Sequence, residues 1–176
     1  AFNTVSRQEF LEQVRHHMPG LASWSEWCYG APTNLLFGQS TIRSEAGVQQ
    51  GDPLGPLLFC LALQPALRKL ASPQRPEHRL DLVFSYLDDL CLAGPAEAVA
   101  SALRVLQEEL GRIGLQLSTD DKCEVVTTAG ARHTVDRKAF PPHFKFNTSQ
   151  CFELLGGPIG SPSFCNAHTK KRVAKA

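Results

Sequence analysis

The sequence contains no long hydrophobic run and few features that mark membrane or secreted proteins. None of its apolar stretches reaches the length needed to span a bilayer, and no signal-peptide pattern opens it. Its six cysteines are scattered without Cys-x-x-Cys spacing, so neither a zinc site nor a disulfide framework is indicated. We therefore predict no membrane partner. Free thiols in a reducing compartment are the simplest interpretation of the cysteines.

A large excess of charge of either sign is also missing, because the formal net charge is only +1. The charge is unevenly distributed, however. Residues 1–121 carry 9 Lys and Arg against 14 Asp and Glu, whereas residues 122–176 carry 9 against 3. An acidic half followed by a basic half suits a protein that binds cations in one place and phosphates in another. A solvated basic surface explains the second half equally well.

Two adjacent carboxylates are the most informative feature that is present. Asp88 and Asp89 lie between the apolar runs 82–84 and 90–92, which predict two strands. Ionised carboxylates in an apolar setting need a partner. A divalent cation such as Mg²⁺, held by carboxylates together with substrate phosphates, is a natural one. A solvated hairpin turn is the alternative, because Asp is common in turns.

A second unusual segment lies upstream, over residues 49–56. Its sequence is Gln-Gln-Gly-Asp-Pro-Leu-Gly-Pro, which predicts an ordered loop. Pro56 lies at the expected start of a helix that continues to about Leu70 with a kink at Pro65. Free backbone N–H groups at the start of that helix would suit an anionic or nucleotide ligand. A Gly/Pro linker before a core helix is an equal alternative on composition alone.

The rest of the sequence predicts an α+β fold of one globular domain. Ser6 and Glu9 form a capping-box pattern that starts a helix ending near Met18. A second helix follows over about 21–29, and its Trp24 and Trp27 are expected in the core. The other expected elements are strands at 34–37, 41–45, 80–86, 90–93, 115–117 and 122–127, a helix between Pro95 and Gly114, and a loop over 129–149.

The acidic pair and the upstream loop together resemble the palm of a reverse transcriptase. Residues 50–59 resemble the family's template- and nucleotide-contacting loop, and residues 86–89 resemble its metal-binding turn. The sequence of residues 47–54 is most similar to the corresponding segment of non-LTR (LINE-type) retrotransposon enzymes. Two further blocks follow in the family's order. Residues 114–124 resemble the lysine-bearing segment, and residues 152–160 resemble the primer-grip hairpin.

The resemblance implies a right-hand polymerase palm, which has a small antiparallel sheet with helices packed on one face. We expect the palm over residues 1–165 and the start of a basic connector or thumb helix over 166–176. Residues 1–5 resemble the tail of the family's first catalytic block, so its Asp and the fingers are expected upstream of Ala1. The sequence is therefore interpreted as part of a longer protein.

The implied reaction is nucleotidyl transfer from a dNTP to a DNA primer 3′-hydroxyl on an RNA template, with Mg²⁺ or Mn²⁺ as cofactor. The implied metal ligands and catalytic acids are Asp88 and Asp89. Lys122 is implied to neutralise or protonate the leaving pyrophosphate. Phe2 would exclude a 2′-hydroxyl, although a core Phe fits the pattern as well. The other implied contacts are Gln50, Gly51 and Tyr86 to the nucleotide or template, and Leu155 and Gly156 to the primer.

Three functions are compatible with these motifs. The first is an RNA-directed DNA polymerase of a retroelement, which would act in cytoplasm or nucleus. The second is a domesticated or decayed palm that binds RNA or serves as a scaffold. The third is a palm-fold nucleotide cyclase. The loop at 49–56 and the hairpin at 152–160 disfavour the cyclase, because neither has a purpose without template and primer.

Overall fold

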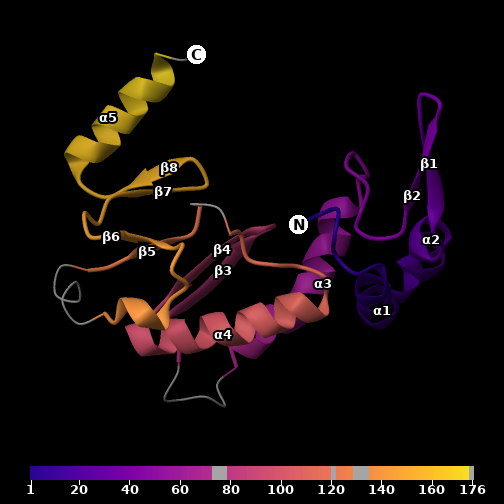
Figure 1. The fold of residues 1–176 in the computed structure, drawn as a ribbon, viewed down its shortest axis with the longest axis horizontal. Coiled ribbons are helices and arrows are strands. Elements are labelled where there is room, and N and C mark those ends of the chain that lie inside the picture. Colours follow the sequence, from indigo (N-terminus) through magenta and orange to yellow (C-terminus); the bar gives the residue numbers. More distant parts are fainter. Residues whose placement is uncertain (73–78, 120–121, 129–134, 175–176) are drawn as a thin grey trace. The chain divides into compact units, whose positions relative to one another are not determined.

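The computed structural model describes residues 1–72, 79–119, 122–128 and 135–174. They belong to two compact units, 1–117 and 118–176. Helices and mostly antiparallel strands alternate along the chain, so the predicted α+β class is confirmed (Figure 1). Within the described ranges, no helix is long and apolar enough to cross a membrane.

The first unit begins with helices α1 (Arg7–His17) and α2 (Pro19–Tyr29), which pack against each other. The predicted cap of α1 is confirmed, because the Ser6 hydroxyl accepts a hydrogen bond from the Glu9 backbone N–H at 3.3 Å. The buried stripe of α1 contains Phe10, Leu11 and Val14.

The expected burial of the two tryptophans is wrong. Trp24 is 55% exposed and Trp27 is 78% exposed. Helix α2 instead buries Ser25 and Tyr29, which lie four residues apart and so share one face. The tryptophan rings contact each other outside that face, with 5.2 Å between their centroids.

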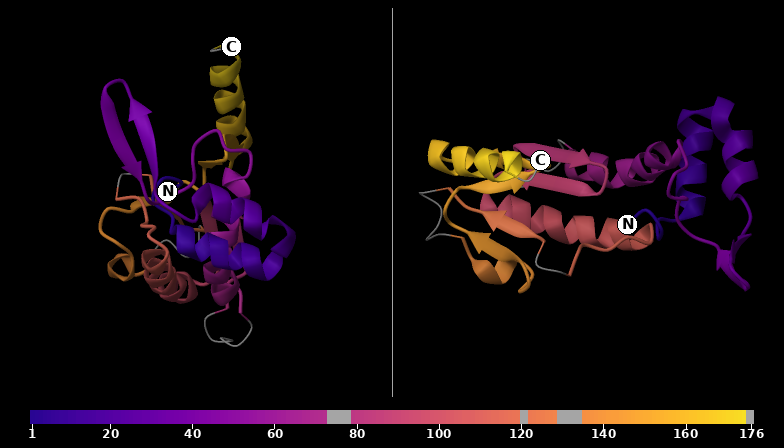
Figure 2. Two further views of the ribbon diagram at one scale, coloured as in Figure 1. Left: turned by 90° about the vertical axis from the view of Figure 1, so that its right-hand side faces the viewer. Right: turned by 90° about the horizontal axis from the view of Figure 1, so that it is seen from above.

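Strands β1 (Thr33–Phe37) and β2 (Ser40–Ser44) form the predicted hairpin. Phe37 pairs with Ser40, so the connecting loop is Gly38-Gln39 as expected. Gly38 has a φ of +59°, which short hairpin loops require and which glycine adopts at no steric cost. Nearly all residues of the two strands are exposed, and Figure 2 shows the hairpin as an arm that extends away from α1 and α2.

Helix α3 (Gly55–Leu70) confirms the helix expected after the unusual loop. Pro56 lies in its first turn, where the missing N–H of proline costs nothing. The helix continues through Pro65, which lies on its exposed side. Its buried face is formed by Leu58, Phe59, Leu61, Ala62, Leu63 and Ala66.

Strands β3 (Leu82–Tyr86) and β4 (Asp89–Ala93) form the hairpin that carries the acidic pair. One face of the hairpin packs on helix α4 (Ala96–Arg112). The shared core contains Leu80, Ala98 and Ala102, and Leu70, Val83, Leu92 and Val99 pack around it.

The end of α4 confirms the stop predicted at Gly114. The Leu115 N–H donates to the Leu110 carbonyl at 2.8 Å and the Gly114 N–H donates to the Gly111 carbonyl at 3.3 Å. This is the Schellman pattern, and the φ of +75° at Gly114 is the left-handed conformation that it needs. A Cβ at Gly114 would also lie 2.6 Å from the Thr4 carbonyl oxygen.

The second unit contains short strands and one helix. Strand β5 (Glu124–Val126) pairs with β6 (Lys145–Asn147), and β7 (Phe152–Leu154) pairs with β8 (Gly157–Ile159). A 3₁₀ turn, η2 (Arg137–Ala139), precedes β6. Helix α5 (Pro162–Val173) begins at the N-cap Ser161, whose hydroxyl accepts from the Phe164 N–H at 3.3 Å.

Three expectations about arrangement need correction. The described strands pair two by two rather than in one antiparallel sheet, and the β5–β6 pair is parallel. Residues 115–117 are not a strand. The loop expected over 129–149 contains η2 and β6, and its residues 129–134 lie outside the described ranges.

The domain boundary expected at 165/166 falls inside the continuous helix α5, so the division into palm and connector stays a prediction.

Candidate active site

The acidic pair lies at the loop end of the β3–β4 hairpin. Tyr86 pairs with Asp89 across the strands, so Leu87 and Asp88 form a two-residue loop and Asp89 begins β4. Both carboxylates are exposed. The apolar runs on either side therefore do not desolvate them, as the alternative of a solvated hairpin turn expects, and their role as metal ligands stays a prediction.

The loop itself has an unusual backbone. Leu87 has a φ of +55°, a conformation that non-glycine residues seldom adopt. The Ser85 hydroxyl donates to the Leu87 carbonyl at 2.9 Å and so fixes the loop from the side of β3. Tyr86, 60% exposed, lies on the outer face of the hairpin next to the acidic pair. The loop therefore presents two carboxylates and a phenol ring to solvent.

Asp88 and Asp89 are the residues of this region that could hold a divalent metal ion. Hard oxygen donors suit Mg²⁺ and Mn²⁺, and a Mg²⁺ site commonly takes one or two carboxylates with the rest of its shell from water and substrate phosphates. The described residues contain no group of three or more His, Cys, Asp and Glu side chains placed to hold a metal ion. The donor set fits such an ion in part, and it needs ligands from outside this pair.

A buried tyrosine, Tyr29, forms hydrogen bonds to both ends of the loop at 49–52. The Tyr29 hydroxyl donates a hydrogen bond to Asp52 Oδ2 and accepts one from the Gln49 N–H at 3.3 Å. Burial, with the hydrogen bond to Asp52, raises the pKa of Tyr29 to about 12, so its hydroxyl stays protonated and able to donate. Gln50 and Gly51 are exposed above this support, and Gly51 has a φ of +94°.

Asp52 corrects part of the expectation of free N–H groups at the start of α3. Its Oδ1 accepts from the Leu54 N–H at 2.8 Å, and its backbone carbonyl accepts from the Gly55 N–H at 3.0 Å. The protein therefore supplies its own anion at this helix end, where negative charge is favoured. An anionic ligand would compete with Asp52 for these donors.

Phe2 lies beside this loop. The Val48 N–H donates to the Phe2 carbonyl at 2.9 Å and the Gly47 N–H donates to the Val5 carbonyl at 2.9 Å. The half-buried Phe2 ring is stacked on the buried Phe59 of α3, with 4.4 Å between centroids and 9° between planes. The structure thus brings Phe2 close to the Gln50-Gly51 loop. One side of its ring packs on the core, as the core interpretation expects, while the residue keeps some exposure.

A buried arginine completes this region. Arg7 Nε donates to the Gly47 carbonyl at 3.0 Å, and its other nitrogens donate to the Ser44 carbonyl at 2.9 Å and the Ser44 hydroxyl at 2.7 Å. Gly47 has a φ of +73°, and a Cβ there would lie 2.3 Å from the Asn3 carbonyl carbon. Gly47 is therefore needed for the close approach of residues 1–5 to the loop.

Sequence reasoning alone does not find several of the residues that position these loops. Tyr29 and Arg7 have no motif of their own, and their partners lie many residues away along the chain; Asp52 lies within the motif at 49–56, but its hydrogen bonds are not apparent from the sequence. The first unit contains both of the motifs that carry the resemblance, the loop at 49–56 and the acidic turn at 86–89.

The second unit carries the other expected site residues. Lys122 is exposed, and its side chain has no hydrogen bond or ion pair within the described residues. The 152–160 hairpin is confirmed: Leu154 pairs with Gly157 across a Leu155-Gly156 loop. Both loop residues have positive φ, +51° and +78°, as a type I′ turn requires. Their contact with a primer stays a prediction.

Comparison with known proteins identifies the family. Residues 1–159 match the family described as reverse transcriptase (RNA-dependent DNA polymerase). This chain belongs to the reverse transcriptase family. It is 31% identical over 144 residues to the retrotransposable element SLACS 132 kDa protein of Trypanosoma brucei gambiense. The match covers 74% of this chain and 11% of that protein, and no solved structure matches. The expected relationship to retrotransposon enzymes is confirmed.

Proposed function

We propose that this chain is the palm of an RNA-directed DNA polymerase that transfers nucleotides from dNTPs to a primer 3′-hydroxyl on an RNA template. The observation that carries the proposal is the placement of two adjacent carboxylates, Asp88 and Asp89, at a tight hairpin turn whose backbone is fixed by the Ser85 hydroxyl. Family membership over residues 1–159 supports it. The chain spans about 11% of the length of the curated relative, so fingers and thumb of the same polypeptide are proposed partners.

Asp88 and Asp89 would hold the divalent ions of this reaction, Mg²⁺ or Mn²⁺. Such ions supply charge neutralisation on the phosphates and a lowered pKa of the attacking hydroxyl. The work of the protein is then positioning, which requires ligands on a rigid support. The bond from Ser85 to the Leu87 carbonyl and the packing of β3–β4 on α4 provide that support.

Phe2, with its ring fixed on Phe59, would lie against the sugar and exclude a 2′-hydroxyl. Gln50 and Gly51 would contact the incoming nucleotide and template from the loop that Tyr29 supports. Tyr86 would also contact the nucleotide or the template. From the second unit, Lys122 would neutralise the leaving pyrophosphate, and the Leu155-Gly156 loop would hold the primer backbone.

The substitution Asp88→Asn in the full-length protein tests this function. It removes the charge of one metal ligand and keeps the shape of the side chain, so primer extension on an RNA template should fall by a factor of about 10³ or more. Binding of the template–primer, measured by fluorescence anisotropy, should change less than about threefold, because phosphate contacts dominate it.

Two outcomes would contradict the proposal. Extension at the normal rate by Asp88→Asn would remove Asp88 from the metal site. A wild-type full-length protein that binds template–primer but does not extend it with Mg²⁺ or Mn²⁺ would instead support the domesticated or decayed palm. The variant Ser85→Ala should have a smaller effect on primer extension than Asp88→Asn, because it loosens the loop without removing a metal ligand.

A further inference from the structure

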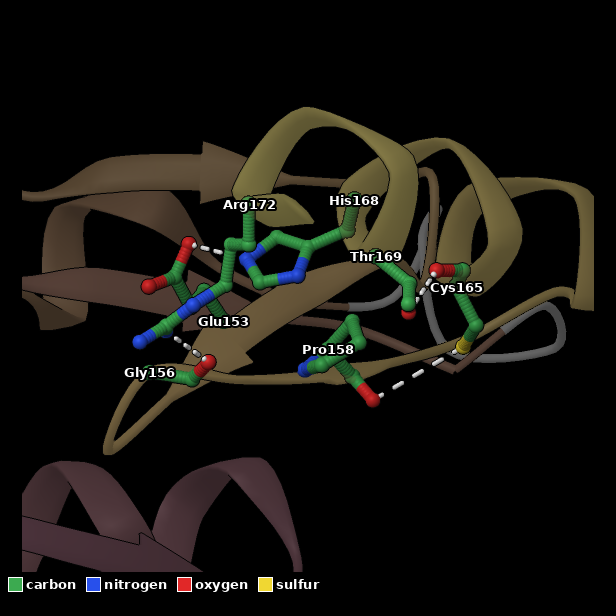
Figure 3. A network of polar contacts seen from close by, with 7 residues as sticks. All are labelled: Glu153, Gly156, Pro158, Cys165, His168, Thr169 and Arg172. Carbon is green, nitrogen blue, oxygen red and sulfur yellow. Dashed lines mark hydrogen bonds and ion pairs between the residues drawn. The ribbon is translucent and has the colours of Figure 1, made fainter. Parts of the chain in front are cut away.

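The tip of the β7–β8 hairpin is held by helix α5. Arg172 Nη1 donates to the Gly156 carbonyl at 2.6 Å (Figure 3). Gly156 is one of the two residues of the hairpin loop, and Leu155 beside it is 48% exposed. The loop therefore presents one residue to solvent while its backbone is tied to a cation on the helix.

This interaction is the last of a row along one face of α5. One turn earlier, His168 Nε2 lies 2.9 Å from Glu153 Oε2 on strand β7, and near the helix start Cys165 Sγ lies 3.7 Å from the Pro158 carbonyl on β8. The helical positions 165, 168 and 172 follow the spacing of one helix face, and Figure 3 shows them turned toward the hairpin. The helix is thus docked along the hairpin, and Arg172 is the residue that joins it to the loop.

The geometry also explains the residues at both ends of this hydrogen bond. An arginine is charged at any relevant pH and carries several donors, which makes its bond to a carbonyl strong and directional. On the other side, a Cβ at position 156 would lie 2.8 Å from Arg172 Nη1, and Gly156 has a φ of +78°. The left-handed backbone at position 156 favours glycine, and a side chain there would require the guanidinium to shift.

The neighbouring cations behave differently. Lys170 and Lys171 are exposed, and within the described residues neither side chain has a hydrogen bond or ion pair. Lys171 therefore carries the same charge as Arg172, one residue away on the same helix, without a hydrogen bond to the hairpin. The chain thus offers a matched pair that separates the effect of charge from the effect of the hydrogen bond.

We propose that Arg172 is a positioning residue for the primer terminus, acting through the Gly156 carbonyl on the Leu155-Gly156 loop. This inference rests on the proposed function, in which that loop holds the primer. Arg172 does not need to touch nucleic acid: it fixes the loop conformation in which the primer end is recognised. Removing its guanidinium should weaken recognition of a recessed 3′ terminus more than it weakens general duplex binding.

The experiment compares Arg172→Gln, Arg172→Lys and Lys171→Gln in the full-length protein. Dissociation constants are measured by fluorescence anisotropy for a template–primer with a recessed 3′ end and for a blunt duplex of the same length. Arg172→Gln should reduce the preference for the recessed end by about tenfold, the size expected for one charge-assisted hydrogen bond. Arg172→Lys should restore most of it, and Lys171→Gln should weaken both duplexes equally.

Steady-state primer extension gives a second readout. Arg172→Gln should raise the KM for primer about tenfold and leave kcat within about twofold, because the reacting groups are untouched. Equal effects of Arg172→Gln and Lys171→Gln on the end preference, or a wild type without any preference, would overturn the inference. A wild type that shows the preference without extension would contradict the proposed polymerase function and leave the role of Arg172 at the terminus standing.

Discussion

Phe2 shows how one side chain can serve both packing and selection. Its ring is stacked on Phe59, which is buried, and its carbonyl accepts a hydrogen bond from Val48. The stack fixes the orientation of the ring, and a fixed ring excludes a competing group by steric overlap more sharply than a mobile one. The two interpretations of Phe2 therefore make different predictions when the ring is removed.

Replacing Phe2 with Ala should separate the core role from the sugar gate. Removal of a half-buried ring should lower the free energy of unfolding by about 1–3 kcal/mol, measured by urea denaturation. If Phe2 is also a gate, the ratio of kcat/KM for dNTP over rNTP in the full-length protein should fall by about tenfold or more. Phe2→Leu, which keeps an apolar side chain of intermediate size, is the control. A folded Phe2→Ala variant with an unchanged ratio would make Phe2 a core residue only.

Some residues of the candidate site are predictable from the sequence, and others are not. Asp88 and Asp89 stand out because their chemistry is local to a short motif. Tyr29 and Arg172 do not, because a tyrosine under a loop and an arginine beside a hairpin have ordinary neighbours in sequence. The size of Trp24 and Trp27 predicts a place in the core, yet the face of α2 that packs is set by Ser25 and Tyr29.

At the scale of elements, helices α3 and α4 are joined by a three-residue ion network. Lys69 Nζ and Arg112 Nη1 both lie near one oxygen of Glu109, at 2.6 and 2.7 Å. The hydrogen bond from Lys69 lowers the pKa of Glu109, with Arg112 adding to the effect. The carboxylate is therefore more favourable in the folded chain than in the unfolded one.

Glu109→Gln should destabilise the chain by about 1 kcal/mol at neutral pH, since networked pairs lie at the upper end of surface ion pairs. Because the folded-state pKa is lowered, the contribution is fully present above the ordinary glutamate pKa of about 4.3 and is lost as the pH falls through the folded value. Urea denaturation at several pH values measures this. Glu108→Gln, next to it on the exposed side of α4, is the matched control. A difference between the two variants that persists in acid would refute the ion network as the cause.

The ends of elements were predictable where a local rule decides them. Ser6 caps α1 because its hydroxyl accepts a hydrogen bond from a backbone N–H that has no partner within the helix. Gly114 ends α4 because its left-handed conformation lets the backbone N–H groups that follow bond to the last carbonyls of the helix. Strand β6 was not predictable. It has only three residues, too few for their alternation to predict a strand, and it forms because β5 offers it a parallel partner from another part of the chain. Such a pairing depends on tertiary structure and cannot be predicted from the local sequence of either strand.

At the scale of the whole molecule, the two compact units divide the charge. The cations of α5 belong to the second unit, and Lys170 and Lys171 are exposed there. The acidic pair belongs to the first unit. A protein that gathers metal ions in one unit and phosphates in the other would show this division, and so would a protein with a solvated basic surface. The salt dependence of nucleic-acid binding distinguishes them.

The double substitution Lys170→Gln with Lys171→Gln should lower the salt dependence of duplex binding by the 176-residue chain. Removing one lysine–phosphate interaction reduces the slope of log Kd against log salt concentration by about one, so the slope should fall by about two. Arg68→Gln with Arg104→Gln removes the same charge from exposed positions of the first unit and should change the slope by less than half as much. Fluorescence anisotropy with an RNA–DNA duplex at a series of salt concentrations gives both slopes. An unchanged slope for Lys170→Gln with Lys171→Gln would mean that these two lysines contact no phosphates and belong to a solvated surface.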